Sequence, residues 1–236
     1  MQRIEFIYKL GSQEPIHVWE KIELLLKNLG ESCPLILYGK KVAASKLSAE
    51  IKKRKGSFNV EYGGFVFHMA TVTNYNHVLL QIDSKEHPEE WWACWVSELI
   101  KLQGFIQAWL VDAEFNYWQN ATDPIQYKSK GRSYEGLPMI SNGLPPPLEQ
   151  LKIDISKNLG LRKICYGYVE AIGAIMWLSE DFLDLNKRSI EWISKNSGAR
   201  VEQVSEGVYE LMVSRRLFCD GTSLDEQMKL RQAIYR

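Results

Sequence analysis

Tryptophan is concentrated in one short part of this 236-residue chain, and that concentration constrains the fold more than any other feature. Five of the eight tryptophans lie between Trp91 and Trp118. The first three of them belong to an apolar face whose residues recur at helical spacing: Trp91, Trp92, Trp95, Val96, Leu99 and Ile100. A face this wide and aromatic gains much free energy by leaving water. We therefore expect this helix at the centre of a core, or in a core that continues into a partner surface.

The ends of this helix carry local signals. Pro88, Glu89 and Glu90 are typical of a first helical turn. Proline suits the first helical position, and carboxylates suit the positive end of the helix dipole. Gly104 is the expected C-cap.

Strand patterns fill much of the remaining chain. Alternating or continuously apolar patterns predict strands at residues 3–10, 35–38, 58–62, 65–72, 77–83, 105–111, 201–204 and 208–213, and a strand-like stretch at 162–178. Gly63-Gly64 forms a hairpin turn, and Gly167 and Gly173 mark a bulge or a close backbone approach. Helical periodicity predicts helices at residues 15–29, 40–55, 113–119, 148–158 and 180–194. A terminal helix opens at Ser223, which has capping-box spacing to Glu226.

This order of elements predicts an α+β fold, with a mixed, mainly antiparallel sheet of hairpins packed by amphipathic helices. Residues 128–147 are rich in Gly and Pro and read as a linker or a long functional loop. We expect an N-terminal α+β region at residues 1–127 and a C-terminal α+β region at 148–236. The segment 128–147 either separates them or is a loop within a single domain.

Charge and hydropathy argue against nucleic acid and membranes as binding partners. Lys+Arg and Asp+Glu balance at 29 each, so no global field attracts nucleic acid or an anionic membrane. The longest apolar run, residues 171–178, is too short to cross a bilayer, and the N-terminus has no cleavable signal pattern. The four widely spaced cysteines are expected to be buried thiols in a reducing compartment: Cys33, Cys94, Cys165 and Cys219. We expect a cytoplasmic protein without a membrane partner.

Few residues suggest chemistry. The histidines (His17, His68, His77 and His87) lack the spacing of metal ligands, although His68 and His77 lie on neighbouring predicted strands. No nucleotide-binding loop and no nucleophile elbow is present. We therefore predict no catalytic residue, no metal and no cofactor, and a binding protein rather than an enzyme.

Two charged segments leave alternatives open. Glu180, Asp181 and Asp184 are either paired carboxylates of a hydrolase or the charged start of a helix. The basic residues of segment 40–55 form a solvated helix face, a partner-binding face or a contact with phosphates. An enzyme with a non-obvious carboxylate site, or a nucleic-acid-associated protein using helix 40–55, is thus the alternative function.

The layout as a whole resembles that of bacterial immunity proteins, which neutralise polymorphic or type VI secretion toxins, and is most similar to the immunity protein family fifty-two type. The resembling parts are the early strand and helix (residues 4–29), the run 76–82 leading into Trp91-Trp92, the segments 107–112 and 175–179, and the terminal hairpin and helix.

This resemblance implies a cytoplasmic, non-enzymatic inhibitor of one cognate toxin, a nuclease effector, whose active site or assembly it blocks. Nuclease toxins tend to be basic around the substrate cleft, so an acidic patch on the inhibitor would mimic phosphate and speed association. The candidate partner-binding residues are Glu135, Glu180, Asp181 and Asp184. The loop 128–147 is a second candidate, because long exposed loops often carry recognition.

Overall fold

The computed structural model describes residues 1–28, 34–54, 57–85, 91–221 and 223–236. Its strands are β1 (Gln2–Lys9), β2 (Leu35–Leu37), β3 (Lys40–Val42), β4 (Ser57–Tyr62), β5 (Phe65–Val72), β6 (His77–Ser84), β7 (Phe105–Asp112), β8 (Met139–Ser141), β9 (Leu151–Ile153), β10 (Lys163–Cys165), β11 (Tyr168–Glu170), β12 (Ile175–Ser179), β13 (Arg200–Ser205) and β14 (Val208–Met212). Its helices are α1 (Pro15–Asn28), α2 (Ala44–Lys53), the short 3-10 helix η1 (Thr73–Tyr75), α3 (Trp92–Leu99), α4 (Ala113–Asn120), α5 (Pro124–Ser129), α6 (Glu180–Asn186), α7 (Ile190–Ser197) and α8 (Leu224–Tyr235).

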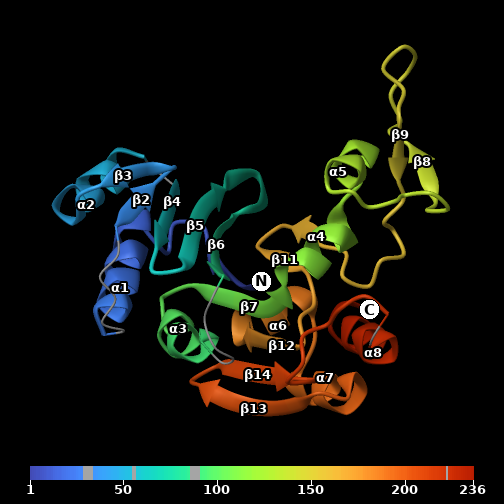
Figure 1. The fold of residues 1–236 in the computed structure, drawn as a ribbon. Coiled ribbons are helices and arrows are strands. Elements are labelled where there is room, and N and C mark those ends of the chain that lie inside the picture. The colour runs from blue at the N-terminus through green and yellow to red at the C-terminus, as the bar shows by residue number, and fades with distance from the viewer. Residues whose placement is uncertain (29–33, 55–56, 86–90, 222) are drawn as a thin grey trace.

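One large antiparallel sheet organises the molecule (Figure 1). Ten of the described strands follow each other in the order β13-β14-β12-β7-β1-β6-β5-β4-β2-β3. The strands β8 and β9, and likewise β10 and β11, pair as separate two-stranded hairpins. The predicted α+β class with mainly antiparallel hairpins is confirmed.

Helices cover opposite faces of the two halves of this sheet. In strand β1, Phe6 and Tyr8 point into a core that holds α1, α2 and α3. Ile7 points to the other face, into a core built with α6, α7 and α8. Strands β4 and β5 alternate between buried and half-exposed residues, because the helices cover only one of their faces. Among the described helices, none covers the other face of β4 and β5.

The tryptophan-rich region forms the core that the sequence predicts. Trp95 and Trp109 are fully buried, and Trp91 and Trp118 nearly so. Trp92 is half-buried and packs against Trp177, with ring centroids 5.4 Å apart. The predicted first turn at residues 88–90 lies outside the described residues. The C-cap prediction was wrong, because α3 ends at Leu99 with Ile100 as its C-cap, and Gly104 lies beyond it in the turn before β7.

Gly173 confirms the predicted close backbone approach. A Cβ atom at this position would lie 2.4 Å from the carbonyl oxygen of Leu110, a backbone atom of the neighbouring strand β7. Only glycine allows strand β12 to begin so close to β7.

Three local predictions were wrong. The helix expected at residues 40–55 begins only at Ala44, because residues 40–42 fold back as β3 onto β2. The helix expected at 148–158 is replaced by β9, whose backbone pairs with β8. Ser223 has a left-handed backbone, and its side chain makes no cap hydrogen bond, so the capping box does not form.

The cysteines differ from expectation in exposure. Cys94 and Cys165 are half-buried free thiols, whereas Cys219 is exposed in the loop before α8, so its predicted burial was wrong. Cys33 lies outside the described residues.

Strands from both predicted regions share the large sheet, since β12 pairs directly with β7. The segment 128–147 contains the end of α5 and the strand β8. The division into regions 1–127 and 148–236 stays a prediction. Among the described helices, none has the length and apolar character needed to cross a membrane.

Candidate functional site

The hairpin of β8 and β9 projects from the body of the molecule (Figure 1), and several of its large apolar side chains are exposed. We call residues 137–151, which contain β8 and β9, the apolar arm. Six of its large apolar side chains are between 38% and 62% exposed: Leu137, Met139, Ile140, Leu144, Leu148 and Leu151. A group of exposed apolar residues on one projecting element is typical of a surface that binds another molecule.

Asn142 organises the tip of the arm. Its side-chain oxygen accepts hydrogen bonds from the backbone N–H groups of Leu144 (3.1 Å) and Gln150 (3.2 Å). Its side-chain amide donates to the carbonyl oxygen of Leu148 at 3.1 Å. The backbone N–H of Asn142 also donates to the carbonyl of Gln150 at 2.8 Å. These bonds fix the tip in one conformation, and an arm ordered in advance has less conformational entropy to lose on binding.

The base of the arm is anchored on α4 and α5. Ile153 is buried in a small cluster with Trp118, Ala121 and Tyr127. Its backbone N–H donates to the carbonyl of Thr122 at 2.8 Å. The anchor holds the arm in a defined position relative to the large sheet.

A capping box fixes helix α5, which forms part of this anchor. The Asp123 side chain accepts from the backbone N–H of Ile125 at 2.8 Å, and the Gln126 side chain accepts from the backbone N–H of Asp123 at 3.4 Å. Pro124 takes the position where its missing N–H is not needed.

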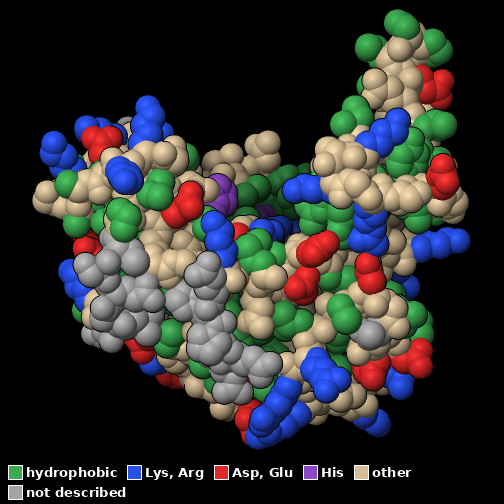
Figure 2. Space-filling model, viewed as in Figure 1, with side chains coloured by type: hydrophobic (Ala, Val, Ile, Leu, Met, Phe, Trp, Pro, Cys, Tyr) green, Lys and Arg blue, Asp and Glu red, His purple; other side chains and the backbone are tan. Residues whose placement is uncertain are grey.

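A hollow lies between the arm and the β2–β4 side of the molecule, with basic and histidine side chains on its floor (Figure 2). The same face of β4, β5, β6 and the first part of β1 carries polar side chains, of which Glu5 and Asp83 are buried: Arg3, Glu5, Asn59, Glu61, His68, Gln81 and Asp83. A cavity of about 930 Å³ continues from Arg3 and Arg162 along α4, past Tyr117 and Asn120, to Lys130. The arm and this hollow are adjacent parts of one surface.

Two ion pairs stabilise the floor of the hollow. Arg3 donates to both carboxylate oxygens of Asp83, at 2.6 Å (Nε) and 3.2 Å (Nη2). Gln81 also donates to Asp83, at 2.8 Å. Arg162, from the loop before β10, places Nη2 2.9 Å from Oε2 of the fully buried Glu5. These pairs link the C-terminal part of the chain to β1, and their charges cancel.

The histidines on this side do not form a metal site. His68 lies opposite Gln81 and His77 opposite Val72, so the two histidines are about 13 Å apart along the strands. Burial lowers the pKa of His68, opposed by the charge of Asp83. Burial also lowers the pKa of His77, opposed by a hydrogen bond to the carbonyl of Tyr75. In the described residues, which exclude His87, no group of three His, Cys, Asp or Glu is arranged to hold a metal ion.

The predicted acidic residues fall on two separate segments. Glu180 and Asp181 are in the first turn of α6, behind the N-cap Ser179, as the helix-start interpretation predicts. Asp181 pairs with Lys9 at 2.8 Å, whereas Glu180 and Asp184 are exposed. Glu135 is exposed in the loop between α5 and β8. The structure thus groups three of the four carboxylates on one helix and places Glu135 near the arm.

Some basic residues of segment 40–55 contact side chains from the same N-terminal part of the chain. Lys53 forms an ion pair with Glu50 on α2, and the Arg54 guanidinium lies 4.4 Å from the ring centroid of Tyr38. Lys40 and Lys41 lie on the edge strand β3, where lysines discourage pairing with other chains. Its basic residues are thus divided between a strand and a helix.

Sequence reasoning missed Arg162, Glu5 and the projecting hairpin. A charge inside the apolar run of β1 could have signalled a buried ion pair, but its partner is distant in the sequence. The hairpin could have been found from Asn142-Gly143, a turn-forming pair flanked by apolar residues.

A solved structure has a similar fold. The Pseudomonas aeruginosa T6SS protein PA0821, where T6SS denotes a type VI secretion system, aligns with a TM-score of 0.56 and 9% sequence identity. The alignment covers 99% of this chain and 72% of that chain. At this identity the likeness shows a shared fold alone. No protein-family model matches the sequence. No curated protein matches it either. The relation to the immunity protein family fifty-two type stays a prediction.

Proposed function

We propose that this chain is an immunity protein associated with type VI secretion, which binds a cognate secreted toxin and neutralises it. The observation that carries the proposal is the apolar arm, with its exposed leucine, isoleucine and methionine side chains on an organised hairpin. The fold shared with a T6SS protein supports an association with type VI secretion.

The arm is suited to enter a groove of a partner protein. Burying its apolar side chains would favour the complex, because apolar surface removed from water contributes roughly 25 cal/mol per Å² against the free-energy cost of association. Leu144 and Leu148 lie at the tip, where an inserted element makes its deepest contacts. The adjoining hollow would contact the toxin surface around that groove. The complex would then cover the toxin's active site or prevent the toxin from assembling.

The partner we propose is a nuclease effector. A nuclease needs a basic cleft to hold its substrate, and exposed carboxylates on the inhibitor would complement that cleft. Glu135, Glu180 and Asp184 are exposed and form no ion pair with other described residues, while Asp181 is paired with Lys9. Charge reversal of Glu180 and Asp184 to lysine is expected to slow association and to weaken its dependence on salt.

The test is co-expression with the product of the gene adjacent to this chain's own gene. We expect a stoichiometric complex that survives high salt, together with rescue of growth in cells that produce the toxin. If the chain neither binds the neighbouring product nor rescues growth, the proposal is rejected. Retention on DNA that salt abolishes, lost when Lys52 and Lys53 are neutralised, would favour the nucleic-acid alternative instead.

A further inference from the structure

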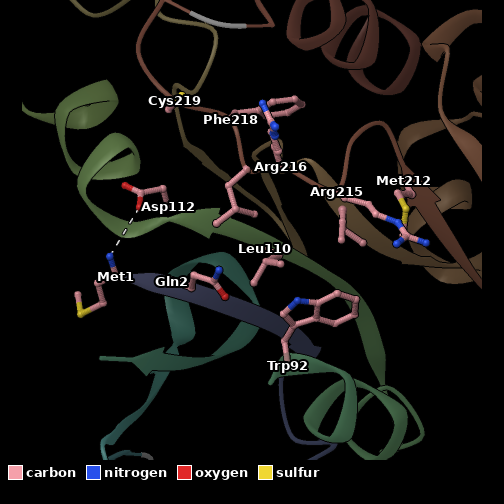
Figure 3. A pocket seen from close by; sticks show the side chains of 12 residues that line it. Met1, Gln2, Trp92, Leu110, Asp112, Met212, Arg215, Arg216, Phe218 and Cys219 are labelled. Atoms are coloured by element: carbon pink, nitrogen blue, oxygen red, sulfur yellow. Dashed lines mark ion pairs between the residues drawn. The ribbon is translucent and has the colours of Figure 1, made fainter. Parts of the chain in front are cut away.

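A second cavity lies beside α3, on the face of the sheet opposite the core of α6, α7 and α8. It has a volume of about 780 Å³, within the range of small-molecule sites. Its apolar wall comes from Trp92 of α3, Leu110 of β7, Ile175 of β12 and Met212 of β14. The loop after β14 supplies Arg215, Arg216, Phe218 and Cys219 to the other side (Figure 3).

The charge balance of this cavity is positive. Figure 3 shows Arg215 and Arg216 across the cavity from Trp92, and Asp112 turned toward Met1. Asp112 is already engaged, since its side chain accepts from the backbone N–H of Phe115 at 2.8 Å and lies 3.7 Å from the N-terminal amino group. Among the described residues, neither arginine side chain has a hydrogen bond or an ion pair. Two guanidinium groups without an ion pair among the described residues thus line a cavity whose other wall is apolar.

We propose that this cavity is a binding site for an amphipathic carboxylate, a small molecule with an apolar chain or ring that ends in a carboxylate group. The apolar part would lie against Trp92 and Leu110. Arg215 and Arg216 would pair with the carboxylate, because a guanidinium presents two parallel N–H donors that match its two oxygens. This inference does not depend on the proposed function.

The experiment uses octanoate as the probe and the alkylation of Cys219 as the readout. Cys219 is exposed and lines the cavity, so a bound ligand is expected to slow its reaction with N-ethylmaleimide. Cys165, which does not line the cavity, is the internal control within the same mass-spectrometric digest. We expect octanoate to protect Cys219 in a saturable manner, and acetate and octyltrimethylammonium to leave its rate unchanged. Hexanoate, which has two methylenes fewer, should bind roughly 15-fold more weakly, because each buried methylene contributes about fourfold.

Variants test the role of the arginines. The double variant Arg215→Ala/Arg216→Ala should bind octanoate at least roughly tenfold more weakly, since bonds between charged groups are lost. The double variant Arg215→Lys/Arg216→Lys should retain part of the affinity. Arg200→Ala removes an exposed arginine on β13, outside the cavity, and should change nothing. Thermal unfolding of each variant checks that it folds.

Three results would overturn the proposal. The first is an octanoate affinity that the double alanine variant leaves unchanged. The second is equal protection by octanoate and octyltrimethylammonium, which would mean that charge is not recognised. The third is no protection by octanoate, including the case in which a glutamate-rich peptide protects instead, since the cavity would then receive a protein segment.

Discussion

Replacing Arg162 with alanine should destabilise the fold strongly, because it leaves the Glu5 carboxylate buried without its main partner. Glu5 is 0% exposed, and Arg162 approaches it at 2.9 Å. Removing one member of a buried ion pair costs about 3–5 kcal/mol. We expect the low end, about 3 kcal/mol, because Arg3 remains 4.0 Å from Glu5 and the Arg162 side chain is itself 22% exposed.

The assay is urea unfolding at pH 7, supported by thermal denaturation. For a chain of this size, about 3 kcal/mol corresponds to a lower Tm by roughly 6–12 °C. Lys163→Ala is the matched control, since its pair with Glu170 spans 3.5 Å with a lysine that is 65% exposed. Such a surface pair contributes about 0–1 kcal/mol.

A second substitution separates the charge from the packing. In Arg162→Ala/Glu5→Gln the buried group is neutral, so we expect the double variant to be more stable than Arg162→Ala alone. The reasoning is refuted if Arg162→Ala costs no more than Lys163→Ala, or if removing the Glu5 charge brings a further loss of stability.

Three further predictions concern the fold. Gly173→Ala should cost about 1–3 kcal/mol in unfolding experiments, since its Cβ would lie 2.4 Å from a backbone oxygen, whereas Gly160→Ala, which meets only the Gln119 side chain, should cost less. Burial lowers the pKa of His77 in the folded protein, so its contribution to stability is present above pH 6.5 and is lost as the pH falls through the lowered pKa. The decrease in the free energy of unfolding between pH 7 and pH 5 should therefore be smaller in His77→Gln than in the wild type. An unchanged pH profile would contradict this. Asp123→Ala removes the capping box of α5 and should cost about 1 kcal/mol, with faster amide exchange in residues 125–129 as the local readout; exchange at the wild-type rate would contradict it.

Local patterns predicted most of the sheet. The Gly63-Gly64 turn and the alternation on either side of it define β4 and β5, because a period of two places one residue set in the core. Such signals depend on neighbours in the sequence. The same reasoning failed for β3 and β9, where pairing with another strand decided the structure and overrode a helical pattern.

The candidate site was only partly predictable. The segment 128–147 could be recognised as unusual from its Gly and Pro content, but its end at residue 147 fell inside the arm. The hollow could not be predicted, because it arises from helices that cover opposite faces of the sheet, and no residue pattern reports on that choice. Arg162 and Glu5 meet only through the tertiary fold.

The affinity of arm variants for the product of the neighbouring gene tests the central claim most directly. Calorimetry would compare the wild type, Leu144→Ala/Leu148→Ala in the arm, and Leu24→Ala, an equally exposed leucine on α1. If the arm is a binding hot spot, the double variant should bind at least roughly 30-fold more weakly, while Leu24→Ala should bind like the wild type. Unchanged affinity of the double variant would contradict the role of the arm, and no binding by the wild type would contradict the proposed function itself.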